Sequence, residues 1–286
     1  KSMDKYKKHI MGDASEEPMP LYIIPDRKVS LADVREGMRN HYEGTELSMT
    51  NDPGAGAYKV PYRWRPMTFK SEGREYFNER AIATQQTGFV LIAQMRSWLP
   101  DAVGGILWFG VDDANTAVLT PMYTSITEIP ECYRRGNGSM TEFSWTSAFW
   151  IHNWVANMAY NRYEPMIRDI RPVQKELEDS YVDLVKNTDA KALELLKSSP
   201  AQASAYLTEV CGKVANEATA RWKKLGEYLL VKYMDGNVKK EKDGKFEENG
   251  YGQIVSPNFP GYSQEYYDQV AKSEEAKHLE VPKKDK

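Results

Sequence analysis

Cysteine and histidine are scarce in this chain, which limits the metal and redox chemistry that it can support. The 286 residues include two cysteines, Cys132 and Cys211, and four histidines. The two cysteines are far apart and form no C-x-x-C or zinc-type spacing. We therefore expect neither a metal site nor a bound cofactor. So few cysteines fit a bacterial cytoplasm or a periplasmic or secreted location equally well, and the compartment stays open.

Long hydrophobic runs and an excess of basic charge are also missing. No apolar run approaches the roughly 20 residues that a membrane-spanning helix needs, so we expect no membrane span. Lys plus Arg number 38 and Asp plus Glu 41, which gives a net charge of -3. A nucleic-acid-binding domain is usually basic overall or carries a basic face. The charge balance therefore argues against nucleic acid as a partner.

Apolar residues make up 41% of the chain, and three apolar runs follow one another between Phe89 and Tyr123. Each run ends in a turn signal of Pro, Asp or Asn, a pattern typical of neighbouring strands joined by short connections. Because the runs do not alternate apolar with polar residues, we expect both faces of the sheet to be covered. Three charged residues, Arg96, Asp112 and Asp113, close the first two runs, and a rigid sheet with charges at its rim can hold a binding site.

Helical periodicity follows the strands. Apolar residues recur at three- and four-residue spacing from Ser144 to about Val185, and Pro165 and Pro172 predict a kink or two helices there. We expect a short helix over residues 189–197. A long helix is predicted from Pro200 to about Met234, with Gly236 as its C-terminal stop.

The segments before the strands are mostly irregular. Ser30 is suited to N-cap a helix that stops near His41. A Gly- and Pro-rich ordered loop follows as far as Pro66, and residues 81–87 are expected to be extended.

The whole pattern predicts an α+β fold. Residues 1–143 would form its loop-rich and β portion, and residues 144–236 the helical portion of the same domain. Residues 237–286 would form an irregular segment with a solvated tail over the last fifteen residues.

Four segments in this order resemble a known family. They are Arg39–Thr50 (RNHYEGTELSMT), Pro61–Pro66 (PYRWRP), Val90–Tyr123 with its QMRSWLP, WFGVDDA and PMY elements, and Ser147–Tyr163 (SAFWIHNWVANMAYNRY). Together they resemble the C-terminal half of the cysteine-nucleophile dipeptidases, a family of N-terminal-nucleophile (Ntn) hydrolases. The likeness runs from about residue 25 to residue 236.

The resemblance implies a chemistry and a fold. Members of this family expose an N-terminal cysteine whose thiolate attacks a peptide carbonyl, and its own α-amine, with a pKa of about 7.7–8.0, is suited to act as base. The family fold is a four-layer αββα sandwich. This sequence starts with Lys1, so we expect the nucleophile upstream, in an N-terminal half of the same enzyme. We assign no catalytic residue to this chain, and expect a dipeptide as substrate.

Two charged strand ends are candidates for substrate binding. Arg96 could clamp a dipeptide carboxylate in a bidentate pair, or form a structural salt bridge, for example to Asp112 or Asp113. The two aspartates could bind the substrate's ammonium group. They could equally cap a turn through side-chain-to-backbone hydrogen bonds.

Three more candidates lie in the loop before the strands. His41, beside a Gly-rich stretch, could reach the site, bind a cation together with Glu43, or serve a structural loop. Arg63 and Trp64 could line a pocket entrance, or stack on neighbours within the loop.

Two other functions remain open. An Ntn amidase acting on a non-peptide amide would need a broad apolar pocket with few charges. A non-catalytic binding or scaffold protein would bind a ligand and turn nothing over. A homo-oligomer is possible in each case.

Overall fold

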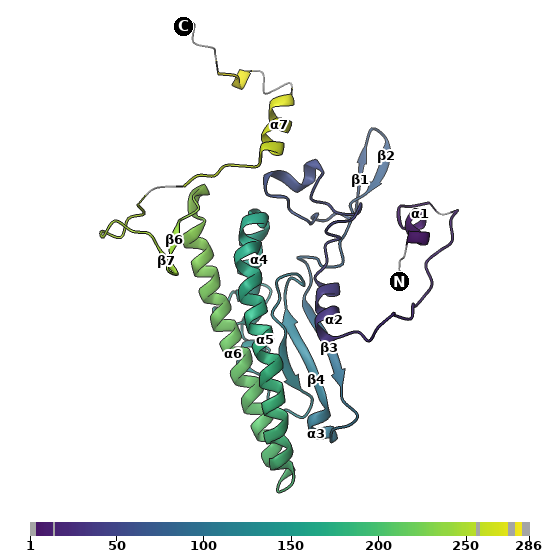
Figure 1. Ribbon diagram of the computed structural model, residues 1–286, viewed down its shortest axis with the longest axis vertical. Helices are drawn as coiled ribbons and strands as arrows, with labels where there is room; N and C mark the ends of the chain where they lie inside the picture. The colour runs from purple at the N-terminus through teal and green to yellow at the C-terminus, as the bar shows by residue number, and fades with distance from the viewer. Residues whose placement is uncertain (1–3, 14, 256–257, 274–277, 282–286) are drawn as a thin grey trace. The chain divides into compact units, whose positions relative to one another are not determined.

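The computed structural model describes residues 4–13, 15–255, 258–273 and 278–281, and divides the chain into two units, residues 1–37 and 38–286. Figure 1 labels most of the helices and strands. The first unit holds η1 (Asp4–Tyr6), α1 (Lys7–Ile10) and most of α2 (Leu31–Met38). The second unit holds every other element.

Helix α2 begins where the sequence predicts. The Ser30 hydroxyl accepts a hydrogen bond from the Asp33 backbone N–H at 3.2 Å, and the Ser30 N–H donates to the Asp33 carboxylate at 2.7 Å. This reciprocal pair satisfies donors that a helix start leaves open. The predicted N-cap at Ser30 is confirmed.

A three-stranded antiparallel sheet stands at the centre of the second unit. Its strands are β3 (Phe89–Met95), β4 (Gly105–Val111) and β5 (Thr120–Tyr123), in the order β3-β4-β5. The short helix α3 (Asp101–Gly104) lies between β3 and β4. The three strands predicted from the apolar runs are confirmed.

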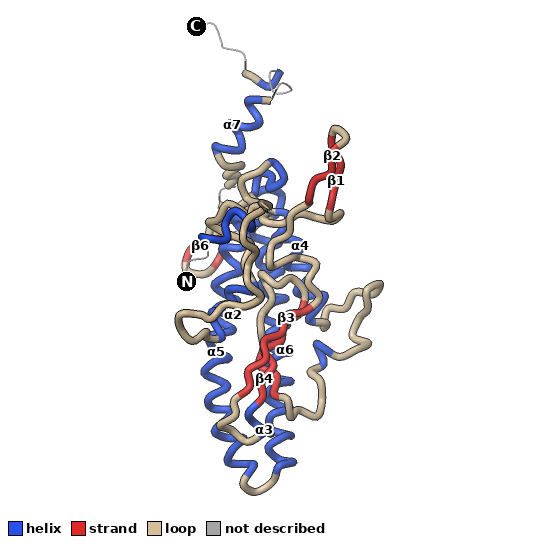
Figure 2. The backbone as a smooth tube through the Cα atoms, turned by 90° about the vertical axis from the view of Figure 1, so that its right-hand side faces the viewer, coloured by secondary structure: helices blue, strands red, loops and turns tan. Residues whose placement is uncertain are grey.

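Three helices cover one face of this sheet (Figures 1 and 2). They are α4 (Ala148–Asn161), α5 (Tyr163–Leu196) and α6 (Pro200–Lys232). On α5 and α6 the buried residues recur every three or four positions, which places one apolar stripe of each helix against the other and against the sheet. The largest fully buried side chains of this layer include Trp108, Trp222, Ile151, Ile170, Leu207 and Leu225.

The other face of the sheet is open, which corrects the expectation that both faces are covered. Phe89 is 62% exposed and Met95 is 71% exposed, and Leu91 between them is exposed as well. In the register, Leu91 is opposite Phe109 of β4, so these residues share one face. We call this surface the open face and define it by Phe89, Leu91, Ala93, Met95, Leu107, Phe109, Val111 and Met122.

The helical layer differs from the prediction only in the helix that was expected over residues 189–197. Two helices meet at Arg162, and Pro165 falls in the first turn of α5, where proline is tolerated. The separate helix expected over residues 189–197 is instead the last part of α5. Helix α6 matches its prediction, since Pro200 is its first residue and Gly236, at φ +80°, follows its end.

Short elements outside the core were not predicted. The hairpin of β1 (Thr68–Ser71) and β2 (Arg74–Phe77) turns at Glu72-Gly73, both at positive φ. A shorter hairpin joins β6 (Glu241–Lys242) to β7 (Lys245–Phe246). Helix α7 (Gln264–Lys272) lies in a segment expected to be irregular.

Outcomes differ for three other predicted segments: residues 81–87, the loop before them and the C-terminal tail. Residues 81–87, expected to be extended, contain a bend and a hydrogen-bonded turn between Thr84 and Thr87. The loop before them contains one short helix, η2 (Pro53–Tyr58), while η3 (Glu131–Tyr133) and η4 (Met234–Gly236) lie elsewhere. Of the predicted solvated tail, residues 274–277 and 282–286 lie outside the described residues. The α+β class is confirmed, and the division at residues 143 and 236 stays a prediction.

Candidate functional site

The side chain of Arg96, which directly follows β3, makes its contacts within the folded chain. Its guanidinium forms a bidentate ion pair with Asp189 of α5, and it also donates to the carbonyl oxygens of Val103 and Gly104. Both charged groups are largely buried. This geometry supports the structural alternative for Arg96, with Asp189 as partner in place of Asp112 or Asp113.

Arg63 and Trp64 hold the preceding loop. The Arg63 guanidinium donates to the carbonyl oxygens of Val60 and Tyr62 at 3.1 and 3.0 Å and pairs with Asp52. Trp64 is 57% exposed and its ring stands edge-on to that of Tyr62, with 5.5 Å between centroids. These contacts fix the loop, and a role for either residue at a pocket entrance stays a prediction.

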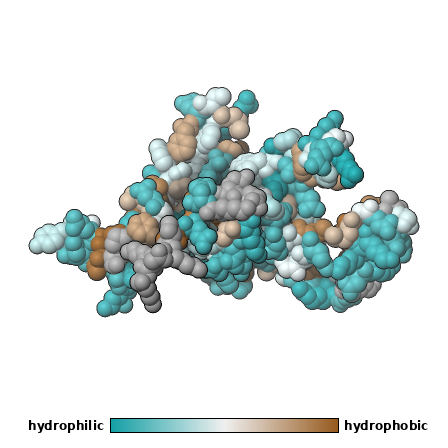
Figure 3. Space-filling model, turned by 90° about the horizontal axis from the view of Figure 1, so that it is seen from above, coloured by the Kyte–Doolittle hydropathy of each residue, from teal (hydrophilic) through white to brown (hydrophobic). Residues whose placement is uncertain are grey.

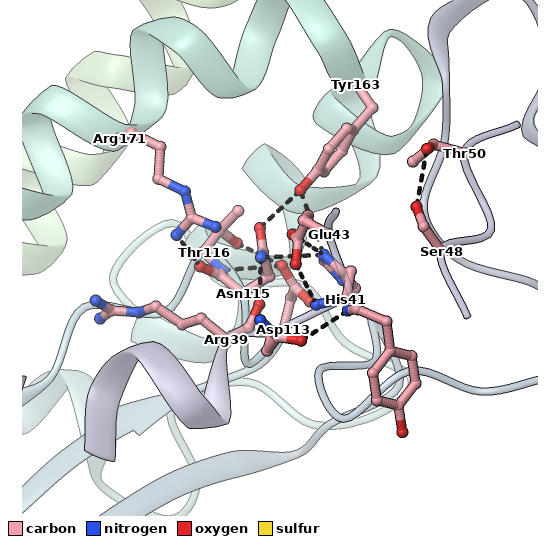
Figure 4. A network of polar contacts seen from close by, with 12 residues as sticks. Arg39, His41, Glu43, Ser48, Thr50, Asp113, Asn115, Thr116, Tyr163 and Arg171 are labelled. Carbon is pink, nitrogen blue, oxygen red and sulfur yellow. Dashed lines mark hydrogen bonds and ion pairs between the residues drawn. The ribbon is translucent and has the colours of Figure 1, made fainter. Parts of the chain in front are cut away.

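His41 lies at the centre of a buried polar network (Figure 4). Its Nε2 is 3.2 Å from the hydroxyl of Tyr160, and that hydroxyl donates to Asp113 Oδ1 at 3.0 Å. Its Nδ1 is 3.2 Å from Asn115 Nδ2 and 3.4 Å from Glu43 Oε1. His41 is fully buried. The relay His41–Tyr160–Asp113 therefore joins the loop after α2, the end of β4 and helix α4 without reaching solvent.

Charges in this network are set by burial and by hydrogen bonds. Burial raises the pKa of Tyr160 well above its ordinary value, and the charge of Asp113 adds to this, so the phenol remains a donor. Burial opposes the ionisation of Glu43, but hydrogen bonds from His41 outweigh it and bring the pKa of Glu43 to about 2.

The adjacent residues Asp112 and Asp113 differ in how many hydrogen bonds their carboxyl groups accept. Asp113 Oδ2 accepts hydrogen bonds from the Thr116 backbone N–H at 3.0 Å and from its hydroxyl at 2.8 Å, which is the turn-capping role. Asp112 adopts φ +67° and is 1% exposed. Its Oδ1 accepts from Asn153 Nδ2 at 2.8 Å.

The second carboxyl oxygen of Asp112, Oδ2, has no hydrogen-bond partner among the described residues. Burial raises the pKa of Asp112 to about 7, against the opposing hydrogen bonds of the Asp113 backbone N–H and Asn153. Binding of a substrate ammonium group by this buried carboxyl stays a prediction.

Sequence reasoning missed the partners that complete this network. Asn115, Tyr160 and Tyr163 come from two distant segments, and the Tyr163 hydroxyl donates to Asn115 Oδ1 at 3.1 Å. Tyr160 and Tyr163 looked like members of an apolar helix stripe. The Asp-Asp-Ala-Asn sequence after β4 was the one signal that could have pointed to Asn115.

A cavity of about 630 Å³ lies on the open face of the sheet. Its floor is formed by Leu107, Phe109 and Val111 of β4, and its wall by the segment from Ile126 to Trp150. The floor residues belong to the open face, so the cavity faces away from α5 and α6.

Neither a metal cluster nor a membrane-spanning helix occurs in the part of the chain that the structure describes. No group of three or more His, Cys, Asp or Glu side chains there could hold a metal ion. None of the helices there is long and apolar enough to cross a bilayer.

Comparison with known proteins points to peptidases. The sequence profile of peptidase family C69 matches residues 2–176. The probable dipeptidase B of Lactococcus lactis subsp. lactis (strain IL1403) is 26% identical over 233 residues, which cover 79% of this chain and 44% of that protein. A probable dipeptidase of Latilactobacillus sakei is 27% identical over 220 residues, 74% of this chain and 41% of that protein. Dipeptidase A of Lactobacillus helveticus is 22% identical over 172 residues, 59% of this chain and 30% of that protein. The chain thus spans less than half the length of these relatives.

Proposed function

Because the chain belongs to peptidase family C69, we propose that it is one portion of a thiol-dependent dipeptidase whose N-terminal cysteine nucleophile lies upstream, outside these 286 residues. The family match over residues 2–176 carries this proposal. The relatives named as dipeptidases are more than twice as long as the part that aligns with this chain.

The two cysteines within the chain fit poorly as nucleophiles. Both are free and buried. Burial raises the pKa of the Cys132 thiol, and it raises the pKa of Cys211 to about 11. A reactive cysteine needs an accessible thiol with a lowered pKa, so a cysteine elsewhere in the enzyme is the better candidate.

The exposed apolar residues of the open face are evidence that another layer of the enzyme covers this face. An antiparallel sheet with helices on one face and exposed Phe89, Leu91 and Met95 on the other leaves apolar surface in water. In an αββα sandwich that face packs against a second sheet about 10 Å away. We propose that the N-terminal half of the enzyme supplies this second sheet over the β3 side of the open face, beside the cavity on β4, and brings its cysteine to the rim of the sandwich.

The chemistry then follows from the nucleophile's own residue. The α-amine of an N-terminal cysteine takes the thiol proton, directly or through a water, and the thiolate attacks the dipeptide carbonyl. Hydrogen-bond donors stabilise the tetrahedral oxyanion until the amine product leaves. Water then hydrolyses the thioester and restores the thiol.

Reconstitution tests this proposal. The 286-residue chain is co-expressed with an upstream portion that begins with cysteine, and the purified complex is assayed with a panel of free dipeptides. We expect hydrolysis that disappears when the N-terminal cysteine is replaced by alanine. A folded complex that carries the cysteine and hydrolyses no dipeptide contradicts the proposal.

A second function is favoured by the cavity. Its floor is wholly apolar, as an Ntn amidase for a non-peptide acyl amide would require. Adding N-acyl amides to the substrate panel separates the two, since only a dipeptidase prefers substrates with a free amine and a free carboxylate.

A further inference from the structure

We propose that the cavity on the open face binds the C-terminal residue of a dipeptide, with a large apolar side chain in the cavity and its carboxylate on Arg135. This assignment rests on the proposed function and deepens it by naming a substrate class. Arg135 replaces Arg96 as the carboxylate-binding residue, because the fold already uses the Arg96 guanidinium.

The cavity has the size and lining of a small-molecule site. Its volume of about 630 Å³ lies within the roughly 300–1,000 Å³ typical of ligand pockets, which are mostly apolar with a few polar groups. Phe109 stands edge-on to Tyr133 across one corner, with 5.1 Å between ring centroids. Phe149 and Trp150 of α4 also line the cavity, and their rings stand edge-on to each other. An aromatic or branched side chain would meet apolar surface on several sides.

The wall opposite the sheet is fixed by hydrogen bonds, so the cavity is formed before a ligand binds. Asn137 Oδ1 accepts from the hydroxyls of Ser144 and Thr146 at 2.6 and 3.0 Å. Trp150 Nε1 donates to the Ser139 carbonyl oxygen at 3.0 Å. A Cβ at Gly138 would lie 3.0 Å from the Trp150 ring. Preorganisation of this kind lowers the entropic cost of binding.

Two adjacent arginines line the cavity, and their partners differ. Arg134 pairs with Glu131 at 3.0 Å and approaches Glu128 at 4.0 Å. The Arg135 side chain forms no ion pair or hydrogen bond with any residue that the structure describes. Its guanidinium is therefore available for a carboxylate, which it can hold through two parallel N–H···O bonds.

Binding to the 286-residue chain tests the assignment without any need for hydrolysis. N-acetyl-L-phenylalanine, its carboxamide and N-acetylglycine are titrated by saturation-transfer NMR, in samples whose near-ultraviolet circular dichroism shows ordered aromatic side chains. We expect the phenylalanine acid to bind about fivefold to tenfold more tightly than its amide, which corresponds to the net contribution of a typical hydrogen bond at a solvent-accessible site. N-acetylglycine should bind most weakly.

Three variants separate charge from shape. Arg135→Gln should abolish the preference for the acid over the amide. Arg134→Gln removes the same charge one position earlier and should keep the preference, because Arg134 already has glutamate partners. Val111→Phe fills the floor and should weaken acid and amide alike. Equal binding of acid and amide by the parent chain, or an unchanged preference in Arg135→Gln, overturns the assignment.

The outcome is distinguishable from failure of the proposed function. If the chain prefers the acid and the reconstituted complex hydrolyses no dipeptide, the cavity is a carboxylate site and the enzyme assignment fails. If the complex hydrolyses dipeptides but the chain shows no preference, the substrate's C-terminal residue binds elsewhere.

Discussion

At Asp112 two unusual features meet in one residue. The backbone lies in the left-handed region at φ +67°, and the carboxyl group is buried with one oxygen unpaired among the described residues. A buried carboxyl favours its neutral form. Its ionisation therefore works against folding at neutral pH.

Replacing this carboxyl should make stability less dependent on pH. The pKa of Asp112 is about 7 in the folded chain, above the ordinary value of 3.8, so the folded chain holds more protons between these values. Its contribution to stability is complete below about pH 4 and is lost as pH rises through 7. Asp112→Asn, which tolerates positive φ, should raise the free energy of unfolding at pH 8 by about 2–4 kcal/mol and leave it nearly unchanged at pH 4. Urea melts at both pH values measure this.

The neighbouring residue supplies the control for that experiment. Asp113 accepts two hydrogen bonds from Thr116 and one from Tyr160. Asp113→Asn should therefore destabilise the chain at pH 8, where Asp112→Asn stabilises it. A gain for both variants at pH 8, or for neither, would contradict this account of the two carboxyl groups.

The sequence located these charged residues but could not assign their partners. Arg96, Asp112 and Asp113 stand at strand ends, as the three apolar runs predicted. Their contacts depend on which distant segments pack beside the strands. Asp189 of α5 is 93 positions from Arg96, and no local pattern in the sequence links the two.

At the scale of elements, Gly226 of α6 lies directly against the Trp154 ring of α4. A Cβ at this position would overlap the ring of Trp154 on α4. Small residues permit such close helix contacts, at the cost of a helix propensity about 1 kcal/mol below that of alanine. The contact therefore fixes the position of α4, which carries Asn153, Phe149 and Trp150.

Two glycine substitutions in α6 should have opposite effects. Gly226→Ala should lower the free energy of unfolding by about 1–3 kcal/mol, because the new methyl group overpacks the contact with Trp154. Gly212→Ala should raise it by about 0.5–1 kcal/mol, since nothing lies within 4 Å of a Cβ there. Thermal or urea melts compare the two. Equal shifts for both variants would mean that the contact has no effect on stability.

Element prediction succeeded where local signals were strong. The strands from Phe89 to Tyr123 and the helix from Pro200 emerged from apolar runs, periodicity and proline placement. The β1–β2 hairpin was missed because its residues are exposed on both faces, so the alternation that marks a half-buried strand is absent. Its turn residues Glu72-Gly73 were the available signal.

For the whole molecule, the open face is the feature that the sequence could not reveal. Continuous apolar runs indicate burial on both faces, and they do not say whether the covering layer belongs to the same chain. Exposed hydrophobic patches also interrupt the hydrophilic surface in Figure 3. Among the described residues of the second unit, α4, α5 and α6 cover one side of the sheet, while Phe89, Leu91 and Met95 on the other side are exposed.

Charges placed on the open face should block assembly while leaving the chain folded. Leu91→Lys and Met95→Lys alter side chains that are already exposed, so each should change the free energy of unfolding by no more than about 0.5 kcal/mol. Both should prevent co-purification with the cysteine-bearing portion, because a buried unpaired ammonium group is costly. Leu230→Lys, at an exposed position of α6, is the matched control and should co-purify normally. Retention of the complex by the Leu91 and Met95 variants would rule out the open face as the docking surface.

The long antiparallel pair α5–α6 has a practical consequence. At about 1.5 Å per residue, the 34 residues of α5 extend roughly 51 Å, and in Figure 1 the pair continues past the end of the sheet. The connection between the two helices, residues 197–199, is largely exposed and contributes no lining residue to the cavity. A fluorophore or affinity tag grafted there would report on assembly without altering the cavity or the strands.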